Sequence, residues 1–265
     1  MTAVPPQPFF CPPHADPRRA DSGTDGENLA RHGHSDLGKK QEKMAVNLEH
    51  PQVSVILPVY NRRHLIQRAL DSIKRQTFTD YELLIVDDGS EDDLEEVVLP
   101  QVLQRAGWRY LKHAHRGLPR TRNIGIQAAL GEFVTFLDSD DEYLPDHLLL
   151  RVEFFRKHPE VDAVHGGVKL VGPEELHWVV DADHPDRKIH IRDCVVGATI
   201  FGKRDVLLEA GGFPVVPYSS ESRLMAGLEK RAAVRKVEFP TYVYHTEPPD
   251  RLCRKREQAQ DETGK

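Results

Sequence analysis

The sequence changes abruptly at Val53, where the segment VSVILPV begins a run that is apolar almost throughout. Such a run is typical of a strand that is buried on both faces of a parallel sheet. The next segment, HLIQRALDSIKRQ, places its apolar residues on one face of a helix. The alternation then continues through predicted strands at 81–88, 108–114 and 132–138 and predicted helices at 91–104, 118–130 and 144–158.

Strands that alternate with helices favour a mostly parallel, twisted sheet with helices on both faces. Because the crossovers between parallel strands are right-handed, a single doubly wound α/β domain is the natural solution. From about residue 161 the pattern loosens into shorter strands, which predict a smaller, partly antiparallel portion. We expect the domain to span 51–248, with one half at 51–143 and the other at 144–248.

The two ends of the chain lack this periodicity. Residues 1–50 are rich in Pro, His, Gly and charge, and this composition predicts a disordered tail. Residues 249–265 predict a frayed tail. Met44 stands just before the first strand, so a start at Met44 is an alternative to the start at residue 1.

Composition excludes several classes of protein. The formal net charge of -6 provides no basic field, so we expect no nucleic-acid partner. Three widely spaced cysteines suggest neither a disulfide framework nor a zinc site, which favours a reducing compartment. No apolar run has the length of a membrane span or a signal peptide. We therefore predict a cytoplasmic protein, with peripheral contact to a membrane left open.

Three polar clusters follow three of the predicted strands directly. They are Pro58-Val59-Tyr60-Asn61, Asp87-Asp88-Gly89-Ser90 and Asp138-Ser139-Asp140-Asp141. In open α/β sheets, ligands bind beyond the carboxyl ends of the strands. Three clusters at equivalent strand ends therefore predict one shared site.

The third cluster is strongly acidic. Five acidic residues lie between Asp138 and Asp146, and crowded carboxylates raise one another's pKa unless a cation compensates them. Asp138 and Asp140 could share a hard divalent ion such as Mg²⁺ or Mn²⁺, or divide a metal and a ribose between them. An acidic turn before the helix that follows Pro145 is the alternative.

The other two clusters and a basic segment each have a ligand-binding interpretation and a purely structural one. Asp88 could accept a hydrogen bond from a base N–H group, and Tyr60 could cover the face of that base, but both clusters also suit turns and helix caps. Guanidinium groups near a helix N-terminus suit a diphosphate, whereas a solvated basic face is the alternative. The basic residues concerned are Arg116, Arg120 and Arg122.

The motifs VSVILPVYN, YELLIVDDGS and RTRNIGIQAALGEFVTFLDSDD, in this order and spacing, resemble those of the family 2 glycosyltransferases. The resemblance is strong from Val53 to Glu142 and weaker to about Glu247. It implies a GT-A fold and an inverting, metal-dependent transfer of sugar from a nucleotide-sugar donor to a hydroxyl acceptor. Residues 51–143 would then form the nucleotide-sugar half and 144–248 the acceptor half, with a UDP-sugar as the default donor.

The resemblance also assigns roles to individual residues. Asp138 and Asp140 match the family's Asp-x-Asp motif, which binds the ribose and a divalent Mn²⁺ or Mg²⁺ ion. His245 resembles a histidine that lies near this metal in some relatives, with a structural role as the alternative. The remaining donor-binding residues would be Pro58, Tyr60, Asn61, Asp87, Asp88, Arg122 and Asn123.

Inversion requires a general base near the acceptor. The family usually supplies it from a Glu-Asp pair at the start of a late helix, and the matching residues here are Glu221 and Ser222. Serine is too weakly basic for this work, so Glu221 is the candidate base, while a first-turn acid that favours the helix dipole is the alternative.

The replacement by Ser222 keeps a second hypothesis open. The chain could be a weakly active or inactive relative that binds nucleotide-sugar and partners another transferase. A nucleotidyltransferase or a Rossmann dehydrogenase fits less well, because no glycine-rich loop follows the first strand.

Overall fold

The protein is described by a computed structural model that covers residues 50–216, 218–248 and 251. The tails predicted at 1–50 and 249–265, and the alternative start at Met44, lie outside these residues apart from His50 and Arg251. Within the described residues, no helix is long and apolar enough to cross a membrane.

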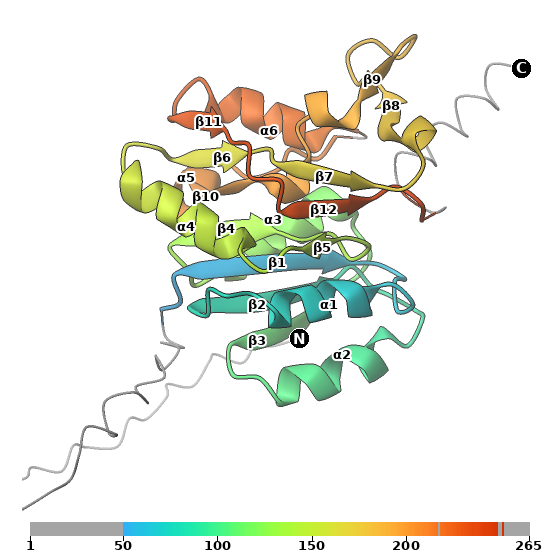
Figure 1. Cartoon of the computed structure of the whole chain (residues 1–265). Coiled ribbons are helices and arrows are strands. Elements are labelled where there is room, and N and C mark those ends of the chain that lie inside the picture. The colour runs from blue at the N-terminus through green and yellow to red at the C-terminus, as the bar shows by residue number, and fades with distance from the viewer. Residues whose placement is uncertain (1–49, 217, 249–250, 252–265) are drawn as a thin grey trace, which may run out of the picture. The chain divides into compact units, whose positions relative to one another are not determined.

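Seven strands form the central sheet. They are β1 (Val53–Val59), β2 (Tyr81–Asp87), β3 (Trp108–Lys112), β4 (Phe133–Phe136), β6 (Ala163–His165), β10 (Phe201–Lys203) and β11 (Val234–Lys236). Their order across the sheet is β11-β6-β10-β4-β1-β2-β3 (Figure 1). The pairs β4–β1, β1–β2 and β2–β3 are parallel, whereas β10 runs antiparallel to both β4 and β6. The expected mostly parallel sheet with a partly antiparallel second half is therefore confirmed.

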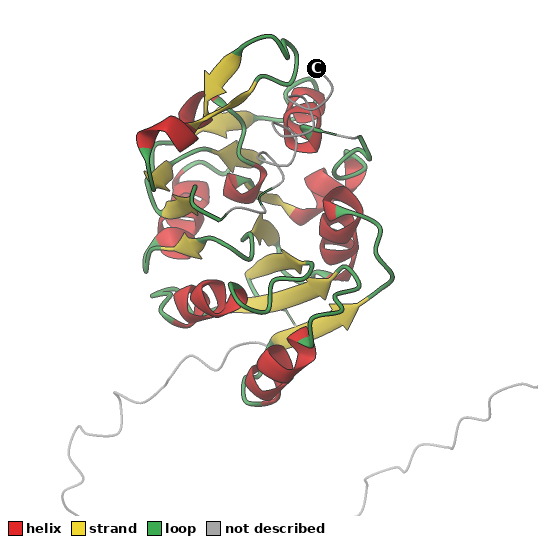
Figure 2. Ribbon diagram, turned by 90° about the vertical axis from the view of Figure 1, so that its right-hand side faces the viewer, coloured by secondary structure: helices red, strands yellow, loops and turns green. Residues whose placement is uncertain are grey.

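Helices cover both faces of this sheet, as the view along its edge shows (Figure 2). In α1, the apolar residues Ile66, Ala69, Leu70 and Ile73 recur every three or four positions and are buried, so the helix follows from its pattern. The α-helices are α1 (Ile66–Lys74), α2 (Leu94–Leu103), α3 (Leu118–Ala128), α4 (His147–Lys157), α5 (Arg204–Glu209) and α6 (Ser220–Leu228). Short 3₁₀ helices lie at η1 (Glu174–His177), η2 (Ile191–Asp193) and η3 (Gly197–Thr199).

Two smaller sheets complete the second half. Strand β12 (Tyr242–His245) lies between β5 (Glu142–Tyr143), to which it is antiparallel, and β7 (Val168–Val171), to which it is parallel. Strands β8 (Trp178–Val180) and β9 (Lys188–His190) form an antiparallel pair. Strand β12 thus brings the end of the described chain next to the residues that follow β4.

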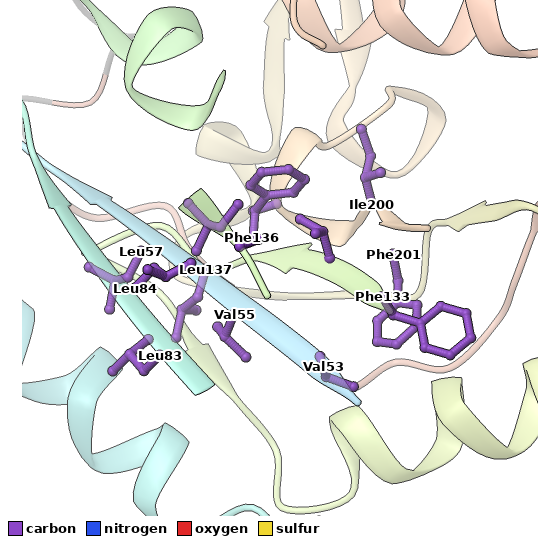
Figure 3. Packing of buried hydrophobic residues seen from close by; sticks show 14 of the residues in the cluster. Val53, Val55, Leu57, Leu83, Leu84, Phe133, Phe136, Leu137, Ile200 and Phe201 are labelled. Atoms are coloured by element: carbon purple, nitrogen blue, oxygen red, sulfur yellow. The ribbon is translucent and has the colours of Figure 1, made fainter. Parts of the chain in front are cut away.

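The core lies along the central strands (Figure 3). Every residue of β1 is buried, as expected of a strand covered on both faces. Phe133 contacts Phe155 of α4 and Phe201 of β10, with ring centroids 4.8 and 5.4 Å apart. A Cβ atom on Gly125 of α3 would lie 2.4 Å from the Ile56 side chain, so a glycine lets this helix approach β1 closely.

Candidate active site

The carboxyl ends of β1, β2 and β4 lie side by side because these strands are parallel neighbours. The first two polar clusters are in direct contact there. The Asn61 backbone N–H donates to Ser90 Oγ at 2.9 Å, and Asn61 Oδ1 accepts from the Glu91 N–H at 2.8 Å. Asn61 has a left-handed backbone with φ of 51°, which asparagine tolerates better than most residues. Asn61 thus joins the loops that follow β1 and β2.

Asp87 is buried and organises the turn after β2. Its carboxylate accepts from the Ser90 N–H at 2.8 Å and from the Tyr110 hydroxyl of β3, and the Lys112 ammonium lies 3.8 Å away. Burial, followed by the hydrogen bond to Asp87, raises the pKa of Tyr110. Asp87 thus holds the turn that carries Asp88 and Ser90.

Asp88 faces the loop between β3 and α3. Its side chain is only 4% exposed, and its carboxylate accepts the backbone N–H groups of Arg116 at 2.7 Å and Gly117 at 2.9 Å. The Nδ1 atoms of His115 and His113 lie 2.9 and 3.5 Å from the same carboxylate. The acid therefore holds the loop that leads into α3.

Tyr60 lies beside this loop and is 41% exposed. Its ring stacks on the His115 imidazole, with centroids 4.0 Å apart and an angle of 23° between the planes. Pro58 is buried in β1, in register with Val86 of β2. The structure thus gathers the residues expected around a base at one strand edge, with Tyr60 and Asp88 both contacting His115.

Arg122 of α3 links the acids after β4 to the first turn of α6. Its side chain is only 3% exposed, and its Nη2 lies 2.8 Å from Asp138 Oδ1. Burial alone lowers the pKa of Arg122, but attraction by Asp138 and Glu221 outweighs it and the net pKa is raised. The rings of Phe136 and Phe213 flank the guanidinium, at 5.9 and 5.1 Å. Arg116 and Arg120, by contrast, are exposed.

The acids that follow β4 are crowded. Burial raises the pKa of Asp141 well above its usual value, and repulsion from Asp140 and Asp138 adds to this. Two donors of β12 oppose the rise, the Tyr242 hydroxyl at 2.6 Å and the His245 N–H at 2.8 Å. Burial and repulsion from Asp138 also raise the pKa of Asp140.

These acids fit a hard divalent cation. Their oxygen atoms are the ligands that Mg²⁺ and Mn²⁺ prefer. Burial first, and then repulsion between the acids, raises the pKa values of Asp140 and Asp141, and a cation would offset the repulsion. Among the described residues, no group of three or more His, Cys, Asp or Glu side chains converges on one point. The His245 ring pairs with Glu142, its Nε2 lying 3.2 Å from Oε1. The His245 ring is thus engaged by a carboxylate, just as the Asp138 carboxylate is engaged by Arg122.

Glu221 lies in the first turn of α6. Its Oε2 accepts from the Ser220 hydroxyl at 3.1 Å, whereas the Ser222 hydroxyl accepts from Ser219 at 2.8 Å. A Cβ atom on Gly197 would lie 2.7 Å from Arg122 Nη1 and 3.2 Å from the Glu221 Cβ. Glycine at 197 therefore allows η3 to pack against both residues.

Asn123 was expected in the donor site, but its side-chain amide binds the backbone of Phe213. Its Oδ1 accepts from the Phe213 N–H at 2.7 Å, and its Nδ2 donates to the Phe213 carbonyl at 2.8 Å. Asn123 thus ties α3 to the segment that leads into α6, next to its neighbour Arg122.

Sequence reasoning missed two side chains that complete the site. Tyr242 donates to Asp141 across 101 residues of sequence, and His115 contacts both Asp88 and Tyr60. No short-range signal pairs Tyr242 with Asp141. His115, which follows a predicted strand like the other clusters, could have been found by that rule.

Comparison with known proteins agrees with this geometry. The family described as "Glycosyl transferase family 2" matches residues 54–201. A Campylobacter jejuni protein named "GalNAc(5)-diNAcBac-PP-undecaprenol beta-1,3-glucosyltransferase" is 44% identical over 98 residues, which are 36% of this chain and 31% of that protein. The chain spans only 18% to 34% of the length of four such curated relatives.

Solved structures show the same fold. S. aureus TarS 1–349 in complex with UDP-GlcNAc superposes with a TM-score of 0.62 at 20% identity, over 76% of this chain and 60% of TarS. The mannosyltransferase PcManGT from Pyrobaculum calidifontis, in complex with GDP-Man and Mn²⁺, gives 0.59 at 22% identity, over 76% and 58%. Since the family match covers more than half of the sequence, the chain belongs to glycosyl transferase family 2, and its fold is the GT-A fold that its motifs indicated.

Proposed function

We propose that the protein transfers a sugar from a nucleoside-diphosphate sugar to a hydroxyl group of an acceptor, with inversion at the anomeric carbon. The observation that carries the proposal is the position of the buried Arg122, which is paired with Asp138 and attracted by Glu221. Through it, the Asp-x-Asp segment and the first turn of α6 meet at one point. A donor phosphate and an acceptor hydroxyl need this proximity to react.

On the donor side, Asp88 and Tyr60 bind the base, with Asn61 and Asp87 holding their loops. Asp138 and Asp140 hold a divalent Mn²⁺ or Mg²⁺, which supplies positive charge for the leaving diphosphate. A UDP-sugar is the first donor to test, because TarS is described with UDP-GlcNAc, and a GDP-sugar is the second, because PcManGT is described with GDP-Man.

On the acceptor side, Glu221 is the catalytic base. Its carboxylate takes the proton of the acceptor hydroxyl as the oxygen attacks the anomeric carbon. The bond from that carbon to the diphosphate oxygen breaks, and the diphosphate leaves with the electron pair on the opposite face. Inversion follows from this single displacement. Asn123, which holds the chain before α6, keeps this helix in position.

The acceptor that the comparisons favour is a lipid-linked saccharide. The Campylobacter relative is named for an undecaprenol-linked acceptor. We propose that the protein works in the cytoplasm and reaches such an acceptor by peripheral contact with a membrane.

A donor-hydrolysis screen tests the proposal. Purified protein is incubated with Mn²⁺ or Mg²⁺ and a panel of nucleotide-sugars, and the released nucleoside diphosphate is measured beside calorimetric binding of the same ligands. We expect metal-dependent release from one donor, lost in Asp140→Ala and kept in Asp205→Ala, whose side chain is exposed on α5.

The other outcomes of the screen are also informative. Tight, metal-dependent binding with no release, even when acceptors are supplied, would favour the alternative of an inactive nucleotide-sugar-binding relative, which Ser222 suggests. Absence of both binding and release across the panel would refute the donor site itself.

A further inference from the structure

The His115 imidazole has two contacts in the base site. One face of the imidazole lies against the Tyr60 ring, with centroids 4.0 Å apart. The imidazole Nδ1 lies 2.9 Å from Asp88 Oδ2. The same Nδ1 atom lies 3.2 Å from the Asp88 carbonyl oxygen. Because a carbonyl oxygen and an ionised carboxylate only accept hydrogen bonds, the imidazole donates from Nδ1 toward Asp88. The ring thus presents one flat aromatic face and one N–H group.

These two features are the ones that the proposed site requires of a nucleotide base. Tyr60 is expected to stack on the base, and Asp88 is expected to accept a base N–H. A ring that already satisfies both groups occupies the place that a base would take. Two rings cannot stack on the same face of Tyr60 at once.

The backbone around His115 is tightly held, so the ring can leave this place only by a movement of its side chain. A Cβ atom on Gly89 would lie 2.8 Å from the His115 backbone nitrogen and 3.0 Å from the His113 carbonyl oxygen, so residues 113–115 press closely on the turn after β2. The backbone amides of Arg116 and Gly117 are also held by Asp88. The loop is therefore anchored on both sides of His115.

The side chain of His115 is free to move in a way that this backbone is not. It is 55% exposed, whereas that of Asp88 is 4% exposed. Rotation about the two side-chain torsions of His115 would carry the ring toward solvent without breaking any backbone hydrogen bond of the loop. Asp88 would keep its two backbone donors and lose only the imidazole.

We propose that His115 is a resident occupant of the base subsite and that the incoming base displaces its ring. The proposal rests on the proposed function, since it takes Tyr60 and Asp88 to be the base site. It makes His115 a residue that sets donor affinity by competition. The measured affinity is then the intrinsic affinity multiplied by the fraction of molecules in which the ring has moved away.

The test is calorimetric binding of UDP, and in parallel of GDP, in the presence of Mn²⁺. The variants are His115→Ala and, as a matched control, His64→Ala, which removes an exposed histidine between β1 and α1. An aromatic pair at the surface corresponds to a roughly threefold to tenfold change in an equilibrium constant. We expect His115→Ala to bind nucleotide about threefold to tenfold more tightly than the unmodified protein, with His64→Ala unchanged.

Weaker or equal binding by His115→Ala would overturn the proposal, because it would make His115 a ligand of the nucleotide or a bystander. That result leaves the proposed function standing, since the unmodified protein still binds. Failure of both proteins to bind UDP or GDP would instead refute the base site, and with it both proposals.

Proton NMR of the His115 ring observes the displacement directly. The Tyr60 ring current shifts the imidazole Cε1–H signal while the two rings are stacked, and Tyr60→Ala gives the reference position. We expect saturating UDP to move the signal toward that of the unstacked ring. A signal that stays at its stacked position under saturating UDP would rule out displacement.

Discussion

Arg122 Nη2 and Asp138 Oδ1 lie 2.8 Å apart, although the arginine comes from α3 and the acid from the loop after β4. The pair is unequally exposed, because the Arg122 side chain is buried and that of Asp138 is 26% exposed. Because water reaches the Asp138 carboxylate, breaking this ion pair costs less free energy than breaking a fully buried ion pair.

Arg122→Gln should therefore destabilise the fold by about 1–3 kcal/mol, since it leaves the Asp138 carboxylate and the nearby Glu221 without their shared cation. Urea unfolding followed by tryptophan fluorescence measures this loss. Arg120→Gln is the matched control, because Arg120 lies on the same helix and is exposed. Equal stability of the two variants would contradict the bridging role of Arg122.

Glu221→Gln tests the catalytic base. The amide is close in size to the carboxylate but cannot take up a proton, so kcat should fall by about 10²–10⁴-fold. Calorimetry should show unchanged nucleotide affinity, because Glu221 acts on the acceptor. Ser222→Ala is the control and should keep activity. Full activity of Glu221→Gln would show that Glu221 is not the base, and a gain of turnover in Ser222→Asp would then show that the unmodified protein lacks the acid that the family carries at this position.

Asn123→Ala tests the two hydrogen bonds that join α3 to the segment before α6. The variant leaves the buried Phe213 N–H and carbonyl groups without their side-chain partners, which should cost about 2 kcal/mol of unfolding free energy. Gln127→Ala, on an exposed position of the same helix, should cost little. Lower UDP affinity at unchanged stability would instead make Asn123 a direct donor ligand.

His147 should make stability depend on pH. Burial, and then repulsion from the Arg151 guanidinium, lower its pKa well below the usual value of about 6.5. The unfolded chain then binds a proton that the folded chain excludes, so the free energy of unfolding should fall as pH drops below about 6.5. Urea unfolding at about pH 7.5 and about pH 5.5 measures this fall.

His147→Gln should show a smaller fall over the same pH interval, because glutamine does not titrate. His64→Gln, which changes an exposed histidine, should match the unmodified protein. Using the difference between variants removes the contribution of the carboxylates that they share. An identical fall in all three proteins would show that His147 does not carry the dependence.

The sequence predicted the first half of the fold well, because buried strands and amphipathic helices alternate there with clear periodicity. The prediction that polar clusters meet at one sheet edge also needed only the parallel order of β1, β2 and β4. Periodicity reports which residues are buried but does not report which strands pair. The insertion of β10 between β4 and β6, and the pairing of β12 with both β5 and β7, therefore appeared only in the structure.

The same limit applies to the site. Asp138 and Asp140 stood out because they directly follow a buried strand. Asn123 was expected beside the donor, and only the structure shows that its amide binds the backbone of Phe213, 90 residues later. The contacts of Tyr242 with Asp141 and of Arg122 with Asp138 depend on the packing of separate elements, which local sequence does not encode.

The two hydrogen bonds from β12 to Asp141 also matter for protein engineering. The interval matched by the family ends at residue 201, before β12 begins. A recombinant fragment cut at that boundary would retain the Asp-x-Asp segment yet lack the Tyr242 hydroxyl and the His245 amide that hold Asp141. Chimeras that exchange acceptor regions between relatives should therefore take residues 138–143 and residues 242–245 from the same parent protein.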